Sequence, residues 1–98
     1  MTAGSTKPAA RTPLVAGNWK MNKTIDEAAD TARALLGGLR AAPGEICPGR
    51  VLICPPFTAL GAVRAALAGD GLVMLGAQDL HWEAQGAFTG EVSGMMLV

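Results

Sequence analysis

The sequence predicts an α/β chain in which short parallel strands alternate with helices. The apolar runs at 51–54 and 72–75 are continuous rather than alternating, which is typical of parallel strands covered on both faces. Between the apolar runs, apolar residues recur every three or four positions, which is the period of an amphipathic helix. Strands and helices in this order favour parallel pairing with right-handed crossovers.

The first strand is predicted over residues 14–17, where a short apolar run follows Pro13. A helix should begin at Thr24, because Thr24 and Glu27 have the spacing of a capping box. Pro43 ends any continuation of this helix. The residues expected to form its apolar stripe are Ile25, Ala28, Ala32, Leu35, Leu36 and Leu39.

The second half of the chain repeats this pattern. Residues 51–54 form the second predicted strand, and Thr58 is the expected cap of the next helix. The third strand, over 72–75, leads into a polar, glycine-rich segment at 78–91. Ser93 is the expected cap of one more helix. The residues of the second helix expected to face the core are Leu60, Val63 and Leu67.

Composition and charge narrow the class of protein. Eight basic and eight acidic side chains give a formal net charge of zero, which argues against a nucleic-acid surface. No stretch approaches the ~20 apolar residues of a membrane span. Residues 1–13 are expected to be a disordered leader. Cys47 and Cys54 lack a metal-ligand pattern and should be free thiols, which favours a cytoplasmic protein without a metal.

Asn18 and Lys20, in the first strand-to-helix turn, are the leading candidates for chemistry. In α/β proteins, ligands bind where the carboxyl ends of parallel strands open. An ammonium there can bind a phosphate or stabilise negative charge on a substrate oxygen. An extended backbone would place both side chains on one face and direct Trp19 toward the core. A solvated surface lysine and an ordinary turn asparagine are the alternatives.

The segment 78–91 is the second candidate, because loops longer than ~12 residues without secondary structure are often functional. Phe88 and Thr89 lie between small residues, as in a tip that inserts into a partner's pocket. A surface loop without such a role is the alternative. His81, the single histidine, is not expected to be a catalytic base. Dinucleotide binding lacks support, because no glycine-rich phosphate motif follows the first strand.

Three segments resemble, in order and at suitable separation, the triosephosphate isomerase family. They are residues 15–22, with Gly-Asn-Trp-Lys-Met-Asn, residues 51–58, with the double proline, and residues 75–93, with Gly-Ala-Phe-Thr-Gly-Glu. The resemblance implies a parallel (β/α)8 TIM barrel. Residues 14–98 would form its first three βα units, ending within the third helix, whereas a whole barrel takes roughly 250 residues.

The resemblance implies an aldose–ketose isomerase of glycolysis and gluconeogenesis. It would interconvert dihydroxyacetone phosphate and glyceraldehyde 3-phosphate through an enediolate, without a metal or cofactor. Lys20 would be a catalytic residue and would bind the substrate together with Asn18. In the family the third loop reaches into the neighbouring subunit of a homodimer. Met21, Phe88 and Thr89 would therefore lie at the dimer interface.

No residue of this chain matches the family's histidine electrophile or glutamate base. The 98 residues alone are therefore expected to be inactive, as an amino-terminal fragment of such an isomerase. The charged fraction of 16%, against roughly 25% in ordinary domains, fits a piece of something larger. The main alternative is a small standalone α/β module that binds a phosphorylated ligand or a partner without catalysis. A nucleotide-binding half-domain is a third hypothesis.

Overall fold

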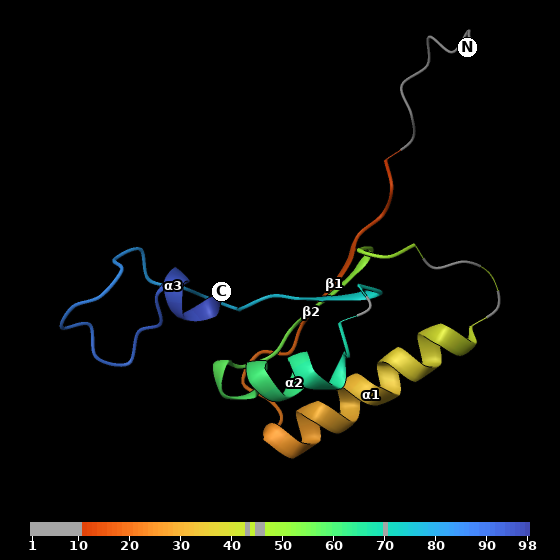
Figure 1. Cartoon of the computed structure of the whole chain (residues 1–98), viewed down its shortest axis with the longest axis horizontal. Helices are drawn as coiled ribbons and strands as arrows, with labels where there is room; N and C mark the ends of the chain where they lie inside the picture. Colours follow the sequence, from red (N-terminus) through yellow and green to blue (C-terminus); the bar gives the residue numbers. More distant parts are fainter. Residues whose placement is uncertain (1–10, 43, 45–46, 70) are drawn as a thin grey trace, which may run out of the picture.

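A computed structural model of the chain shows three parallel strands alternating with helices (Figure 1). The strands β1 (Val15–Asn18), β2 (Val51–Cys54) and β3 (Val73–Leu75) form one sheet in the order β1-β2-β3. Both neighbouring pairs are parallel, so the predicted α/β class and parallel pairing are confirmed. The residues that the structure describes are 11–42, 44, 47–69 and 71–98.

The register of the sheet determines where the strand ends lie. Asn18 is the register partner of Cys54 across β1 and β2, and Ile53 is that of Leu75 across β2 and β3. The carboxyl ends of the three strands therefore meet at one edge of the sheet. We call this the carboxyl edge and define it by Asn18, Cys54 and Leu75 with the residues that directly follow them.

The first helix, α1 (Ile25–Ala41), begins with the predicted capping box. The Glu27 backbone N–H donates to Thr24 Oγ1 at 3.4 Å, and the Thr24 backbone N–H donates to Glu27 Oε1 at 2.9 Å. The second bond favours the carboxylate and lowers the pKa of Glu27 below its ordinary value. The helix continues through Gly37 and Gly38, while Pro43, its expected stop, lies outside the described residues.

The second helix does not begin as predicted. A 3-10 turn, η1 (Phe57–Ala59), follows Pro56 directly, and α2 (Leu60–Ala66) continues from it. The Ala59 N–H donates to the Pro56 carbonyl at 3.0 Å, which places Thr58 inside the turn. Neither η1 nor α2 has a side-chain cap, so the prediction that Thr58 caps this helix is wrong.

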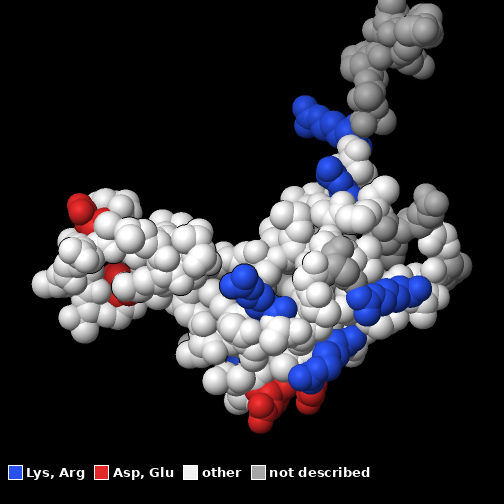
Figure 2. All heavy atoms as spheres, in the orientation of Figure 1, with Lys and Arg blue, Asp and Glu red and all other residues white. Residues whose placement is uncertain are grey.

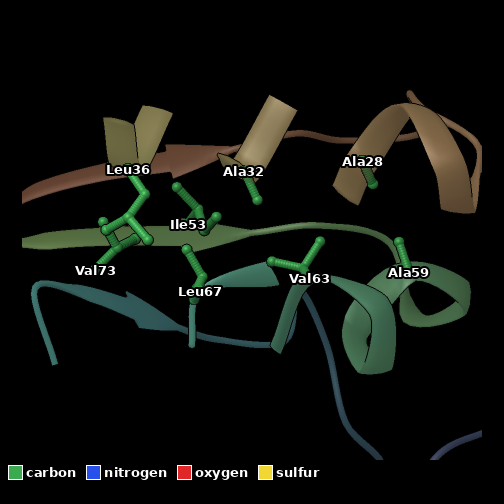
Figure 3. Packing of buried hydrophobic residues seen from close by; sticks show 8 residues of the cluster. All are labelled: Ala28, Ala32, Leu36, Ile53, Ala59, Val63, Leu67 and Val73. Atoms are coloured by element: carbon green, nitrogen blue, oxygen red, sulfur yellow. The ribbon is translucent and has the colours of Figure 1, made fainter. Parts of the chain in front are cut away.

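Helices α1 and α2 pack together on one face of the sheet (Figure 1). Right-handed crossovers between adjacent parallel strands bring successive helices to the same side. The opposite face stays open in the described part of the chain, where Ala16 is exposed and Met74, its neighbour but one in register, is 48% exposed. Coverage of the strands on both faces is therefore not observed. The buried cluster in Figure 3 consists of Ala28, Ala32, Leu36, Ile53, Ala59, Val63, Leu67 and Val73.

Small residues determine which side of α1 faces the core. Ala28 and Ala32 are fully buried, and Ala29 is 7% exposed. Ile25, predicted to belong to the apolar stripe, is 52% exposed at the first turn of the helix. Ala28 and Ala32 share the buried cluster with Val63 of α2 (Figure 3), and their small side chains let the two helices approach closely. Ile25 lies at the end of the helix, outside this contact.

Residues 76–98 extend from the carboxyl edge away from α1 and α2 (Figure 1). This segment ends in α3 (Gly94–Leu97), with Ser93 at its N-cap position as predicted, although the Ser93 side chain makes no capping hydrogen bond. The His81 N–H donates to the Val92 carbonyl at 2.8 Å and closes the base of a long loop. Among the described residues, no helix is both long and apolar enough to cross a bilayer.

The observed capping pattern predicts different effects for two similar substitutions. Thr24→Ala removes a capping hydroxyl and should lower the free energy of unfolding by about 1 kcal/mol. Thr58→Ala should have a much smaller effect, because Thr58 is exposed and caps no helix. Urea unfolding followed by circular dichroism measures both, and equal losses would contradict the observed capping.

Candidate functional site

Lys20 stands two residues beyond β1 at the carboxyl edge, and both Lys20 and Asn18 are exposed. The backbone of Lys20 is left-handed, with a φ of 56°. The sequence predicts that Asn18 and Lys20 lie on one face of an extended backbone. This prediction is wrong at Lys20, because the chain leaves the extended conformation there.

Asn18 fixes the lysine backbone. Its Oδ1 accepts a hydrogen bond from the Lys20 backbone N–H at 2.9 Å. Asn18 therefore holds the backbone of Lys20 in place. The two hydrogens on Asn18 Nδ2 take no part in this bond, so they can donate to a ligand oxygen at the same exposed position.

Trp19 anchors the turn between Asn18 and Lys20. Its backbone N–H donates to the Cys54 carbonyl at 3.1 Å, and its side chain packs against the buried cluster. The prediction that Trp19 faces the core is therefore confirmed. Asn22 Nδ2 donates to the Trp19 carbonyl at 2.9 Å and tightens the turn from its far end.

Gln78 joins this turn to the segment that follows β3. Its Nε2 donates to the Lys20 carbonyl at 2.9 Å and to the Cys54 carbonyl at 2.8 Å. Sequence reasoning grouped Gln78 with the residues after the third strand and gave it no role of its own. One feature of the sequence could have indicated this role: Gln78 follows the third strand closely. A side-chain amide in that position can reach the carbonyls at the ends of neighbouring parallel strands.

Gly76 lets the chain after β3 pass close to β2. A Cβ at this position would lie 3.2 Å from Cys54 Sγ and 3.3 Å from Leu52 Cδ1. The Gly76 N–H also donates to the Ile53 carbonyl at 2.9 Å. A larger residue would push this segment away from the carboxyl edge, and Gln78 follows only two residues later.

The loop over residues 81–93 is organised by its own side chains. The rings of His81 and Phe88 lie 4.2 Å apart, and those of His81 and Trp82 lie 4.6 Å apart. Gly86 has a φ of 147°, and a Cβ there would lie 2.8 Å from Phe88 Cε2. The Phe88 ring is 44% exposed, and Thr89 at the tip is exposed.

Met21, the remaining predicted interface residue, is 95% exposed and adjoins Lys20 in the turn after β1. Phe88 and Thr89 lie on the loop over residues 81–93, which belongs to the extended segment (Figure 1). The structure therefore joins Met21 to Lys20 and Asn18 in one turn. Phe88 and Thr89 form a separate, protruding feature.

Charges are mixed over the surface. Figure 2 shows acidic side chains on the extended segment and along the lower edge of the body, with basic side chains at the centre, the right side and the top of the body. Within the described ranges, no three His, Cys, Asp or Glu side chains come together in a way that could hold a metal ion. Cys47 and Cys54 are both free, with Cys47 exposed and Cys54 half-buried. The turn after β1 therefore offers the Lys20 ammonium together with the side-chain amides of Asn18 and Gln78 at the carboxyl edge.

Comparison with known protein families matches residues 13–98 to the sequence model described as triosephosphate isomerase. The chain belongs to the triosephosphate isomerase family. The observed strand–helix alternation and parallel three-stranded sheet are consistent with the first βα units of that family's TIM barrel.

Relatives in several bacteria agree with this family assignment. The triosephosphate isomerase of Chloroflexus aurantiacus is 59% identical over 88 residues, which are 90% of this chain and 33% of the relative. That of Roseiflexus sp. strain RS-1 is 53% identical over 87 residues, which are 89% of this chain and 32% of the relative. That of Moorella thermoacetica is 49% identical over 90 residues, with the same coverage of 89% and 32%. The chain thus spans about a third of the length of these relatives.

Proposed function

We propose that residues 14–98 form the substrate-holding part of a triose-phosphate isomerase, which interconverts dihydroxyacetone phosphate and glyceraldehyde 3-phosphate. The observation that carries this proposal is the position of Lys20. Its side chain is exposed at the carboxyl edge, where parallel α/β folds bind ligands, and its backbone is held there by neighbouring amides. The family match over residues 13–98 supplies the reaction.

Lys20 is the proposed catalytic residue. Proton transfer between the two carbons of a triose phosphate passes through an enediolate, which carries negative charge on its oxygens. An ammonium already in position stabilises such charge more effectively than water, because it does not have to reorient as the charge develops. The same cation attracts the substrate phosphate. Asn18 adds the Nδ2 hydrogens as donors to a substrate oxygen.

We further propose that these 98 residues do not catalyse the reaction by themselves. Isomerisation needs a group that removes a proton from carbon and returns it to the neighbouring carbon. The resemblance assigns proton transfer to a histidine and a glutamate that match no residue of this chain. The acidic residues nearest to Lys20 in the sequence are Asp26 and Glu27, in the first turn of α1, and Glu27 is held by the capping box. No cofactor or metal is part of the proposed chemistry.

The proposed assembly is a homodimer. Met21 is 95% exposed beside Lys20, so its apolar side chain is available there for contact with another chain. The ring stack and the closed base of the loop over residues 81–93 keep Thr89 on a preformed protrusion. In this proposal, the Thr89 tip of one copy contacts the turn around Met21 of the other.

The proposed location is the cytoplasm. Its support from the structure is the pair of free cysteines, Cys47 and Cys54, because disulfides are the usual state of paired cysteines in oxidising compartments. Immunofluorescence or fractionation of the native protein against a cytoplasmic marker tests this proposal.

A chimeric enzyme tests the role of Lys20. Residues 14–98 replace the matching third of the Chloroflexus aurantiacus relative, and the chimera should interconvert the two triose phosphates. Lys20→Met in this chimera should lower kcat/KM by about 100-fold or more, as for loss of a group that stabilises the developing oxyanion. A coupled spectrophotometric assay in both directions measures the change.

Lys23→Met is the matched control in that experiment. Lys23 is also exposed, follows three positions later and also has a positive φ, of 78°, so the two variants differ mainly in position. The control should keep the kcat/KM of the parent chimera. The proposed role of Lys20 is wrong if Lys20→Met is as active as Lys23→Met. Turnover by the 98-residue chain alone would contradict the proposal that these residues do not catalyse the reaction by themselves.

The dimer is tested in the same chimera by placing a charge at the tip. Thr89→Arg should weaken self-association by about 2 kcal/mol or more, because a buried interface centre tolerates an unpaired charge poorly. Thr58→Arg, at an exposed position on η1, should leave it unchanged. Sedimentation equilibrium measures both, and a Thr89→Arg chimera that associates as tightly as the parent would rule out the proposed contact.

A further inference from the structure

The backbone of Lys20 is left-handed, and the groups around it must hold it in this conformation. A φ of 56° is unfavourable for a residue with a Cβ, and the side chain of Lys20 is exposed, so its own packing does not impose it. Such conformations persist where neighbouring groups hold them, and they often occur at functional sites.

Both backbone polar groups of Lys20 are held by side-chain amides. Asn18 Oδ1 accepts from its N–H at 2.9 Å, and Gln78 Nε2 donates to its carbonyl at 2.9 Å. The two peptide planes on either side of the Lys20 Cα are therefore both restrained. Asn18 belongs to the same turn, whereas Gln78 comes from 58 positions later and fixes the turn relative to the sheet.

The second hydrogen bond of Gln78 connects the turn to the central strand of the sheet. The Cys54 carbonyl, at the end of the central strand, accepts from Gln78 Nε2 at 2.8 Å and from the Trp19 N–H at 3.1 Å. One NH2 group therefore bridges two carbonyls, and both of its hydrogens are used. This geometry also fixes the orientation of the Gln78 amide, because the flipped group would bring Oε1 against two carbonyl oxygens.

We propose that Gln78 is a positioning residue for Lys20: its bridge between the Lys20 and Cys54 carbonyls keeps the Lys20 backbone left-handed and presents the ammonium at the carboxyl edge. This inference rests on the proposed function of Lys20 and adds a residue that does not itself touch substrate. Without the bridge, the Lys20 carbonyl can turn toward water and the side chain leaves the geometry in which it meets a bound anion.

The backbone effect is tested on the 98-residue chain by nuclear magnetic resonance. The one-bond Cα–Hα coupling of Lys20 distinguishes positive from negative φ and should report the left-handed form in the parent. Gln78→Met keeps the length of the side chain, removes the donor and should shift this coupling toward negative φ. Gln85→Met is the control, because Gln85 is exposed and its side chain makes no hydrogen bond to the described residues. An unchanged coupling in Gln78→Met, or a parent chain without a left-handed Lys20, would overturn the proposal.

A pair of substitutions separates positioning from general support of the fold. Glycine adopts a positive φ without the Cβ penalty, so in Lys20→Gly the left-handed backbone no longer depends on the hydrogen bond from Gln78. The drop in melting temperature caused by Gln78→Met should therefore be at most half as large in a Lys20→Gly background as in the parent. An equal drop in both backgrounds would show that Gln78 only stabilises the sheet edge, and would overturn the proposal.

The chimera then shows whether the Gln78 bridge matters for catalysis. Gln78→Met should lower kcat/KM by about tenfold to 100-fold, which is the effect expected when a catalytic group is displaced by about 1 Å. Arg64→Met, at an exposed position on α2, should not change it. Full activity in Gln78→Met, with Lys20→Met still inactive, would overturn this inference and leave the proposed function standing. Full activity in Lys20→Met would refute the proposed function of Lys20, and the inference about Gln78 would fall with it.

Discussion

The Cys54 carbonyl, at the end of the central strand, is the atom on which the candidate site depends. It accepts hydrogen bonds from the Trp19 N–H at 3.1 Å and from Gln78 Nε2 at 2.8 Å. Parallel register brings these donors together, because it places the ends of β1 and β3 on either side of β2. The turn that carries Lys20 and the segment that follows β3 are therefore fixed to the same point. Neither attachment requires burial of Lys20, so the ammonium stays exposed.

The same topology explains why one face of the sheet is well packed and the other is open. Two right-handed crossovers place α1 and α2 on one side, where alanines allow close contact between the helices. Ala16 and Met74 remain exposed on the other side. In the TIM barrel of the family, strands continue around a closed ring and side chains from the strands fill its interior. The open face and the one-third coverage of the relatives fit the first part of such a ring.

Local sequence signals predicted local structure well. The capping box at Thr24, the strand at 51–54 and the position of Ser93 before a helix were all predictable, because each depends on residues within a few positions of one another. Thr58 misled the prediction, because a 3-10 turn after Pro56 is as compatible with the sequence as a capped helix. Gln78 could not be assigned from pattern alone. Its partners lie 24 and 58 positions away, and only the parallel register brings them within reach.

Amide hydrogen exchange of the 98-residue chain tests most directly whether the Cys54 carbonyl organises the carboxyl edge. The Trp19 N–H and the Gly76 N–H both donate to the last residues of β2. They should exchange as slowly as the amides within β2, whereas the amides of residues 82–87, in the loop, should exchange much faster. A Trp19 amide that exchanges as fast as the loop amides would show that the turn is not attached to β2, and would contradict this account of how Lys20 is held.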